Sequence, residues 1–261
     1  MLKFAANLSF LFTEVPFEER FEAAARCGFH AVEYLFPYEH SPQTLKKLLD
    51  DNGLTQALFN APPGDWSKGE RGLACLPDRF DEFREGLDQA RQYAGVLGNR
   101  RIHVMAGVKP DDLDQEEASE AWVNAIRYAA DLLGKDGLTV TAEPINRHDM
   151  PGYFLSDMEQ ALALIEQVDR PNVRLQFDIY HCQRMHGDII WWLSRCWDRI
   201  AHIQVANVPG RHEPDRGELN YRFIFEWLWA RGYAGFIGCE YIPHGETAAG
   251  LGWLDIPEIS A

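Results

Sequence analysis

The sequence predicts a single (β/α)8 barrel, with eight parallel strands inside a ring of helices. Short apolar segments that are typical of strands alternate along the chain with longer amphipathic segments that are typical of helices. There are eight strand-like segments, and a length of 261 residues is common for a one-domain barrel. The main alternative is an open doubly wound sheet, but the glycine fingerprint that would follow its first strand, GxGxxG, is missing. We therefore expect residues 1–261 to form one domain.

The predicted elements follow one another without a linker. The predicted strands are Phe4–Leu8, Ala31–Leu35, Thr55–Phe59, Arg101–Met105, Leu138–Glu143, Val173–Asp178, Ile200–Gln204 and Phe236–Glu240. Apolar stripes at helical spacing mark two of the helices, one through Phe80, Phe83, Leu87, Ala90, Ala94 and Leu97, the other through Ala118, Trp122, Ala125, Ala129 and Leu132. Gly98 and Gly134 follow these stripes, at the position where a helix often ends in a left-handed glycine.

Four strands in the second half of the chain each end in a polar side chain that can bind a metal. These side chains are Glu143, Asp178, Gln204 and Glu240. Successive side chains of a strand point to opposite faces, so the alternation of apolar and polar residues places all four on the polar face. The ends of parallel barrel strands meet at one rim, where functional groups of this fold gather.

Three carboxylates and one amide at the same rim favour a divalent cation. Crowded carboxylates repel one another unless a cation neutralises them, and oxygen ligands favour magnesium, manganese or calcium. The alternative for each acid taken alone is a helix cap or an ion pair with a loop arginine. Four such residues on separate strands favour the metal site.

Three more polar residues are candidates for contact with a substrate. His181 follows Asp178 by three residues and could polarise a carbonyl or move a proton; a hydrogen bond to the backbone is the alternative. His103 is predicted to point into the barrel and line the pocket floor, with a satisfied interior histidine as the alternative. Asn7 lies near the end of the first predicted strand and could also reach the substrate.

Long loops are predicted to surround the barrel mouth. They comprise residues Asn60–Gly72, Pro144–Phe154 and Asn207–Tyr221, and they suggest a lid that keeps water from a small substrate. Arg71 and Arg211 on two of these loops are candidate clamps for a carboxylate or phosphate. The alternative is that both arginines are solvated surface residues.

The overall charge limits the expected partners. The chain has 25 basic and 40 acidic side chains and a net charge of −15, so we expect no binding of nucleic acid. No segment approaches the roughly 20 apolar residues that a membrane helix needs, so no membrane contact is expected. Five cysteines without a CxxC pair are typical of a reducing compartment and predict a cytoplasmic protein. Tryptophans on the helix patterns permit a homo-oligomer.

Many segments of the chain are similar to the hydroxypyruvate isomerase family, one of the xylose isomerase-like barrels. These segments are FAANLSFLFTEVPF, FPYEH, ALFNAPPGDWSKGERG, HVMAG, EPINRHDMPGYF, QFDIYHCQRMHGD, HEPDRGELNY and GCEYIP. The resemblance implies a divalent metal, magnesium or manganese, held by Glu143, Asp178, Gln204 and Glu240, and no organic cofactor. It also implies that Glu143 and Glu240 are the catalytic acid–base pair. Related epimerases have a histidine where this chain has Gln204, which implies a more oxygen-rich metal site.

The resemblance implies a reaction on a small 2-oxo or hydroxy acid. Hydroxypyruvate and 2-hydroxy-3-oxopropanoate (tartronate semialdehyde) would interconvert through an enediolate. The residues expected to bind the substrate are His181, Arg211, Arg71, His103 and Asn7. The alternative is the same isomerisation of 2-oxo-tetronate or a related sugar acid. A metal-dependent phosphodiesterase, as in the apurinic-site endonuclease relatives, and a non-catalytic binding barrel fit the charge and the ligand set less well.

Overall fold

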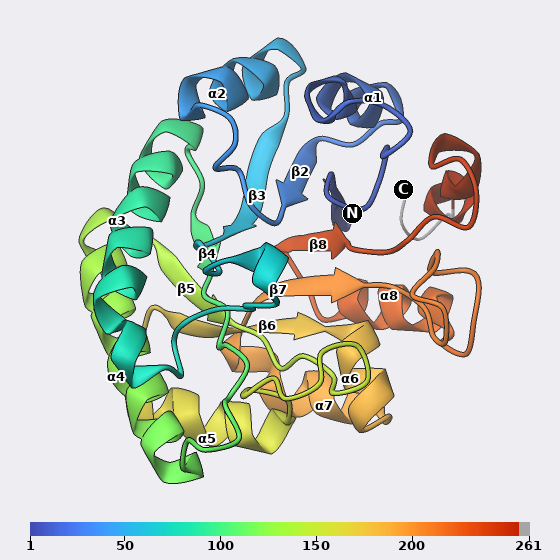
Figure 1. The fold of residues 1–261 in the computed structure, drawn as a ribbon. Helices are drawn as coiled ribbons and strands as arrows, with labels where there is room; N and C mark the ends of the chain where they lie inside the picture. Colours follow the sequence, from blue (N-terminus) through green and yellow to red (C-terminus); the bar gives the residue numbers. More distant parts are fainter. Residues whose placement is uncertain (256–261) are drawn as a thin grey trace.

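The chain folds into a closed barrel of parallel strands (Figure 1). The computed structural model describes residues 1–255, so the last six residues of the predicted domain 1–261 lie outside the described part. The strands are β1 (Lys3–Asn7), β2 (Ala31–Tyr34), β3 (Thr55–Asn60), β4 (Arg101–His103), β5 (Thr139–Ala142), β6 (Val173–Asp178), β7 (Ile200–Val205) and β8 (Phe236–Cys239). They pair in chain order, and β8 pairs with β1 to close the barrel. The predicted (β/α)8 fold is confirmed.

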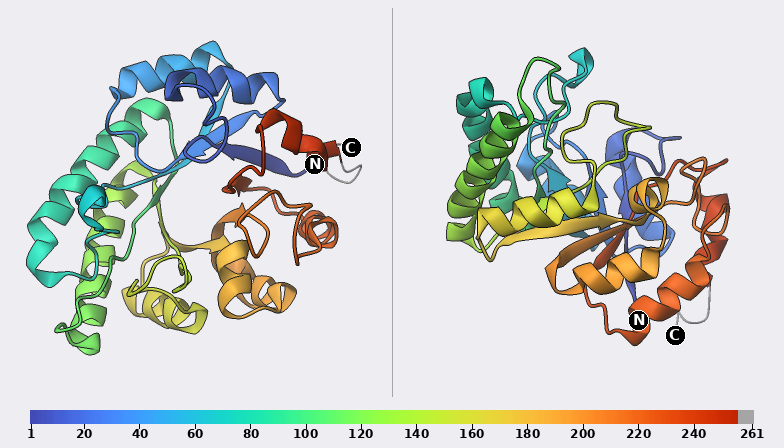
Figure 2. Two further views of the ribbon diagram at one scale, coloured as in Figure 1. Left: turned by 45° about the vertical axis from the view of Figure 1, so that its right-hand side comes forward. Right: turned by 90° about the horizontal axis from the view of Figure 1, so that it is seen from below.

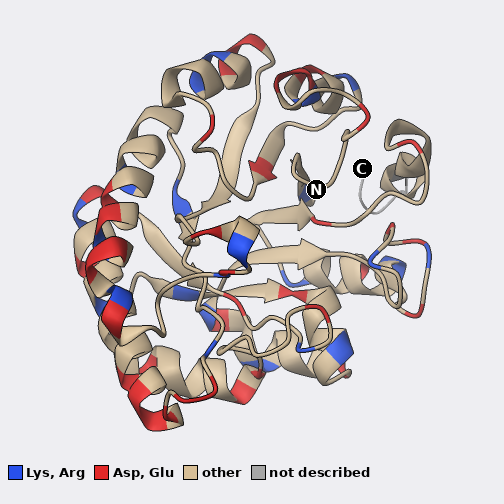
Figure 3. Cartoon of the chain, in the orientation of Figure 1, with Lys and Arg blue, Asp and Glu red and all other residues tan. Residues whose placement is uncertain are grey.

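Helices surround the strands on the outside of the barrel (Figures 1 and 2). The α-helices are α1 (Arg20–Arg26), α2 (Pro42–Asp51), α3 (Phe80–Leu97), α4 (Gln115–Leu133), α5 (Met158–Val168), α6 (Ile179–Met185), α7 (Ile189–Cys196) and α8 (Tyr221–Ala230). Short 3-10 turns are η1 (Phe17–Glu19), η2 (Trp66–Lys68), η3 (Pro77–Arg79), η4 (Gly134–Asp136), η5 (Trp197–Arg199) and η6 (Ala248–Asp255). No helix within residues 1–255 is both long and apolar enough to cross a membrane. Figure 3 shows acidic residues, in red, along α3, α4 and α5.

The two helices predicted from apolar stripes form as expected, but one of them ends differently. Gly98 follows α3 with a φ of 72° and is the predicted left-handed cap. Gly134 was predicted to be the same kind of cap and is not, because its φ is −62° and it begins η4. The left-handed position belongs to Gly137, with a φ of 68°. A Cβ on Gly134 would lie 3.0 Å from the amide nitrogen of Asn172, so close packing accounts for this glycine.

The predicted strands are correct in place, and most differ from the observed ones by one or two residues at an end. Only β6 has both predicted bounds. Glu143 and Glu240 were predicted as the last residues of strands but lie just after β5 and β8, while Gln204 lies inside β7. Strand β4 ends at His103 rather than Met105, because the chain there turns to bridge the loop after β3 through Gly72 and Ala106.

The period-two alternation of the strands separates an apolar outer layer from a polar interior. Val140 and Ala142 of β5 are fully buried on the outer face, which packs against α4. The inner face carries polar pairs instead, since the hydroxyl of Thr141 donates to the Gln176 amide oxygen at 2.9 Å. His202 lies 2.6 Å from a carboxylate oxygen of Glu33, and both are fully buried. The barrel therefore has a polar axis below its mouth.

Candidate active site

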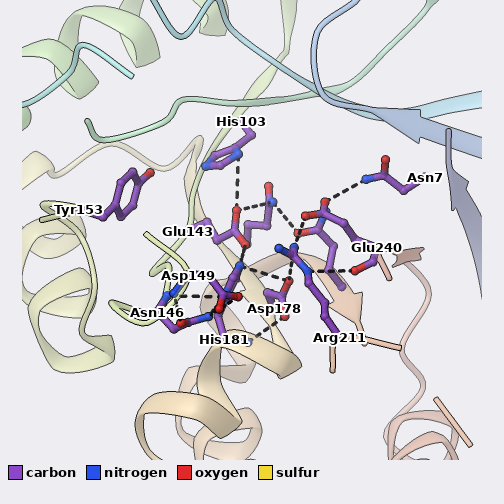
Figure 4. Close-up of polar contacts among 12 residues, drawn as sticks. Asn7, His103, Glu143, Asn146, Asp149, Tyr153, Asp178, His181, Arg211 and Glu240 are labelled. Atoms are coloured by element: carbon purple, nitrogen blue, oxygen red, sulfur yellow. Dashed lines mark hydrogen bonds and ion pairs between the residues drawn. The ribbon is translucent and has the colours of Figure 1, made fainter. Parts of the chain in front are cut away.

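Glu143, Asp178 and Glu240 lie together at the site (Figure 4), and Gln204 hydrogen-bonds Glu240 beside them. Glu143, Asp178, Gln204 and Glu240 are all buried, with at most 7% of any of them exposed. Gln176 of β6 connects Glu143 with Gln204, because its amide nitrogen donates to Glu143 Oε2 at 3.0 Å and to Gln204 Oε1 at 2.7 Å. We call Glu143, Asp178 and Glu240, together with His181 and Arg211, the acidic half of the site.

Glu143, Asp178 and His181 form the tightest group in this half. One potential ligand atom of each lies within 4.8 Å of the others. Glu143 Oε1 and Asp178 Oδ2 are buried and have no hydrogen-bond partner among residues 1–255. A buried carboxylate oxygen without a partner is costly, and a cation placed between two such oxygens removes that cost. These two residues therefore fit a divalent metal ion.

Within this group, His181 is held in one tautomer. Asp178 caps α6, since its Oδ1 accepts from the His181 backbone amide at 3.0 Å, and this holds the histidine in the first turn. The Asn146 side-chain oxygen accepts from the amides of His148 and Asp149, so its amide nitrogen is the atom that lies 2.6 Å from His181 Nδ1. Nδ1 is therefore an acceptor, and the proton is on Nε2.

The Nε2–H of His181 points at the unpartnered carboxylate oxygens. Nε2 lies 3.6 Å from Glu143 Oε1 and 3.8 Å from Asp178 Oδ2. Burial and the nearby Arg211 guanidinium lower the pKa of His181 well below its usual value, so the ring is neutral. In this tautomer the side chain is a hydrogen-bond donor to the centre of the site.

Glu240 is held by a separate set of contacts. Its Oε2 accepts from the Asn7 amide at 2.9 Å and from the Gln204 amide at 2.6 Å, and its Oε1 pairs with Arg211 Nη2 at 2.5 Å. Glu33 supports both amides, because its Oε1 accepts from Asn7 at 3.1 Å and from Gln204 at 2.8 Å. Gln204 and Glu240, two of the predicted metal ligands, are thus close to the group but bound to protein neighbours.

The site carries more negative than positive charge. Burial, Asp178 and Glu240 raise the pKa of Glu143 well above its usual value. Burial raises the pKa of Glu240 to about 8 although Arg211 opposes the shift, and burial likewise raises the pKa of Asp178. Burial acts to lower the pKa of Arg211, but the three carboxylates outweigh it and the net shift is upward. Three carboxylates against one guanidinium leave two formal negative charges, which a divalent cation would neutralise.

A pocket of about 230 Å³ opens beside the acidic half. Its lining includes Glu143, His181, Arg211 and Glu240, whereas Asp178 is not part of it. The opposite side is formed by residues at the ends of β2, β3 and β4, which we call the neutral wall: Leu35, Asn60, His103 and Met105.

His103 joins the two sides of the pocket. Its Nδ1 lies 3.6 Å from Glu143 Oε2, and its side chain points into the barrel as predicted. Burial, with a smaller electrostatic effect of His202, lowers the pKa of His103 to about 3, so the imidazole is neutral. His103 therefore lies at the pocket, and its contact with a substrate stays a prediction.

The loop after β3 covers the pocket with an arginine and an aromatic ring. Trp66 and Arg71 both line the pocket, and the guanidinium of Arg71 lies 3.7 Å from the centre of the Trp66 ring. Arg71 donates to the carbonyl oxygens of Trp66 and Glu70 and makes no ion pair within the described chain. Asn7, by contrast, does not line the pocket, because its amide lies behind Glu240.

The sequence-based prediction missed four residues of the site: Glu33, Asn60, Asn146 and Gln176. Glu33 and Gln176 carry a detectable signal, since each is a polar residue on the inward face of a predicted strand. Asn60 was assigned to a loop although it is the last residue of β3. Asn146 acts through a turn after β5 that orients it toward α6, and alternation within a strand gives no signal for that.

Known proteins resemble the chain over nearly its whole length. A family model described as xylose isomerase-like TIM barrel matches residues 21–256. The chain belongs to this family. A 2-oxo-tetronate isomerase from Cupriavidus necator is 53% identical over 97% of this chain and 98% of its own length. A hydroxypyruvate isomerase from Escherichia coli is 45% identical over 98% of this chain and 99% of its own length.

Solved structures support the same placement. A Brucella melitensis structure titled AP endonuclease, family 2, aligns with a TM-score of 0.95 at 47% identity, covering 97% of this chain and 98% of that one. A 3-keto-D-glucoside 4-epimerase from Escherichia coli aligns with a TM-score of 0.80 over 97% and 98% of the two chains. At 19% identity, the latter match shows the shared fold alone.

Proposed function

We propose that this protein is a sugar-acid isomerase that moves a carbonyl group between C2 and C3 of a small 2-oxo acid, with the interconversion of hydroxypyruvate and 2-hydroxy-3-oxopropanoate as the first candidate reaction. The observation that carries the proposal is the acidic half, in which carboxylates from three strands face one neutral histidine and one arginine. Two of the carboxylates, Glu143 and Glu240, line a pocket large enough for a small acid. The isomerase names of the full-length relatives point to the same class of reaction.

A divalent cation is part of the proposal. Glu143 and Asp178 offer unpartnered oxygens for it, whereas Gln204 and Glu240, the other two predicted ligands, hydrogen-bond each other and would have to exchange protein contacts for the cation. Magnesium or manganese suits these oxygen ligands. When bound, the cation would supply positive charge that stabilises the oxygens of an enediolate.

Proton transfer falls to the two glutamates that reach the pocket. One carboxylate removes the proton from C3 of hydroxypyruvate, and the C–H electrons form a C2=C3 double bond as the C2 carbonyl becomes an enolate oxygen. The other carboxylate delivers a proton to C2, while the hydroxyl proton on C3 passes to the oxygen on C2. No redox cofactor takes part, since the oxidation of C3 is balanced by the reduction of C2 within one substrate. A positioned base of this kind contributes roughly 100- to 10,000-fold to the rate.

The remaining polar groups bind and orient the substrate. His181 lines the pocket with its Nε2–H near the Glu143 and Asp178 carboxylates, so it can donate to the substrate carbonyl oxygen. Arg211 is committed to Glu240, so it orients that carboxylate. Arg71 has no acidic partner among the described residues and lines the pocket, which makes it the better clamp for the substrate carboxylate.

The second candidate substrate is 2-oxo-tetronate, a four-carbon acid with the same reacting atoms. It is favoured by the 53% identity to an enzyme of that name. Removal of the C3 proton and return of a proton to C2 would proceed on the same glutamates.

Hydrolysis of damaged DNA fits the molecule less well, although one relative of known structure is titled AP endonuclease. A chain with a net charge of −15 repels phosphate backbones, and DNA binding needs basic groups that neutralise phosphates. We expect no nicking of DNA that contains abasic sites, and efficient nicking would overturn the isomerase assignment.

The direct test is proton exchange with solvent. Purified protein with magnesium or manganese is incubated in deuterated water with each acid, and the reaction is followed by NMR. We expect deuterium at C2 of the product and at C3 of recovered substrate. Absence of both exchange and product with either acid would refute the proposed function.

A further inference from the structure

The neutral wall contains two buried polar groups that have no role in the proton transfer. Asn60 ends β3 and His103 ends β4, and their Cα atoms are paired in the register of the two strands. Asn60 is 3% exposed and His103 is 1% exposed, and both line the pocket. The other two residues of the neutral wall, Leu35 and Met105, are apolar.

Both groups have an atom without a partner. Asn60 Oδ1 and His103 Nε2 are buried and make no hydrogen bond within residues 1–255. A buried polar atom that loses its water and gains no partner is destabilising, so two of them on paired residues that line one pocket indicate a ligand group that hydrogen-bonds there.

The backbone of Asn60 is fixed, so its side chain is presented to the pocket from a rigid position. The backbone amide of Asn60 donates to Leu35 O at 2.9 Å, and the backbone carbonyl oxygen of Asn60 accepts from the Tyr38 hydroxyl at 2.7 Å. His103 is fixed on the other side by Glu143, 3.6 Å from Nδ1. Nε2 is therefore the ring nitrogen of His103 that is not the one near Glu143.

With its Nδ1–H toward Glu143, the neutral His103 ring accepts at Nε2, and the Asn60 side-chain amide can donate through its nitrogen. A hydroxyl group that donates to the imidazole and accepts from the amide matches both. The neutral wall has no lysine or arginine that could bind a carboxylate. The covering loop has such a group, the guanidinium of Arg71. Hydroxypyruvate has three carbons; two of them react and the third is its carboxylate. It has no further hydroxyl for this wall, but a four-carbon acid carries one on C4.

We propose that Asn60 and His103 bind the C4 hydroxyl of 3,4-dihydroxy-2-oxobutanoate (2-oxo-tetronate) and so make the site selective for four-carbon acids over hydroxypyruvate. The inference rests on the proposed function and adds the residues that choose the substrate. Sites built to hydrogen-bond a hydroxyl discriminate strongly against analogues that lack it, because their own polar atoms stay unpaired.

The test compares three substrates on the full-length protein: 2-oxo-tetronate, its 4-deoxy analogue 3-hydroxy-2-oxobutanoate, and hydroxypyruvate. The 4-deoxy analogue keeps the fourth carbon and lacks only the hydroxyl. We expect kcat/KM for 2-oxo-tetronate to exceed that for the 4-deoxy analogue by at least about 10- to 100-fold. Equal values for these two acids overturn the inference even if no variant folds.

The variant Asn60→Ala assigns the selectivity to this residue. It should reduce the ratio between 2-oxo-tetronate and the 4-deoxy analogue to within a few-fold, mainly by lowering kcat/KM for the hydroxylated acid. Asn99→Ala is the matched control, since Asn99 is also a buried asparagine with an unpartnered side-chain oxygen but precedes β4, at its opposite end. It should change stability and leave the ratio unchanged.

The outcomes separate the inference from the proposed function. Turnover of all three acids without preference, or a preference that survives in Asn60→Ala, refutes the selectivity and leaves the isomerase standing. No turnover of any acid refutes the proposed function, and the inference falls with it.

Discussion

The two sides of the pocket differ in charge. The acidic half gathers three buried carboxylates, each with a charged or hydrogen-bonding neighbour, although Glu143 Oε1 and Asp178 Oδ2 have no hydrogen-bond partner within residues 1–255. The neutral wall has no charged side chain and leaves Asn60 and His103 each with an unpartnered atom. Under the proposed function, the same barrel would separate two tasks: β5 to β8 would supply proton transfer and charge, and β2 to β4 would supply recognition of the substrate.

The division is not complete, because Glu33 of β2 contributes to the acidic half from below. Its carboxylate contacts His202, Gln204 and Asn7, and the last two hold Glu240. Glu33 does not line the pocket, so it acts as a positioning residue. Variants on either side should consequently fail in different ways: changes in the acidic half should affect kcat, and changes in the neutral wall should affect the choice of substrate.

The largest effect is expected from the glutamates of the acidic half. Glu143→Gln and Glu240→Gln each keep the shape of the side chain and remove the base, so kcat should fall by roughly 100- to 10,000-fold. Steady-state kinetics with both acids measure this, and circular dichroism checks that the variants fold. If either variant retains near-normal kcat, that residue does not transfer the proton.

A smaller loss is expected when Glu240 is left intact but its support is removed. Glu33→Gln replaces one acceptor of the Asn7 and Gln204 amides, and we expect kcat to fall roughly 10- to 100-fold while KM changes little. The pH profile of kcat should shift as well, because Glu240 loses its fixed partners. An effect on stability alone, with kcat and the pH profile of wild type, would show that Glu33 is only structural.

The covering loop should contribute binding and no selectivity. Arg71→Ala should raise KM about 10-fold for all the acids tested, because each has a carboxylate, and should leave their order unchanged. Lys68→Ala is the matched control on the same loop, since Lys68 is exposed and paired with Asp65 at 2.9 Å. A loss confined to one acid, or an equal loss in the control, would contradict the assigned role.

The smallest effect concerns stability and pH in metal-free protein. The folded protein raises the pKa of Glu240 from 4.5 to about 8, so it binds more protons than the unfolded chain between these values. Stability should therefore be greatest below about pH 4.5 for this group and decline as pH rises toward 8. We expect a fall in Tm of several degrees across this range, and a smaller fall in Glu240→Gln. A Tm that rises with pH in both proteins would contradict the burial of these carboxylates.

The sequence predicts the acidic half better than the neutral wall, for a physical reason. Glu143, Asp178, Gln204 and Glu240 follow from strand alternation and the common direction of parallel strands, so their meeting needs no knowledge of loops. Whether each carboxylate is free or paired depends on three-dimensional neighbours such as Arg211, which approaches from a loop with a positive φ of 56°. The sequence could not give that orientation.

Asn60 and Asn146 are two residues of the site that the sequence did not predict. Asn60 matters because β3 runs one residue longer than predicted and its side chain then faces the pocket. Asn146 matters because a tight turn aims its amide nitrogen at His181 and thereby fixes the histidine tautomer. Both depend on backbone details at the ends of strands, which residue patterns define least well. The predicted cytoplasmic location and homo-oligomer stay predictions, with Trp191 and Trp229 exposed on α7 and α8.

The central claim is that Glu143 and Asp178 jointly hold one divalent cation beside the substrate. The most direct measurement is a titration of metal-stripped protein with manganese, followed by electron paramagnetic resonance, in wild type and in Asp178→Asn. We predict one bound manganese per chain in wild type, and binding weakened by at least about 10-fold in the variant. Equal binding in the two proteins, or none in wild type, would contradict the account.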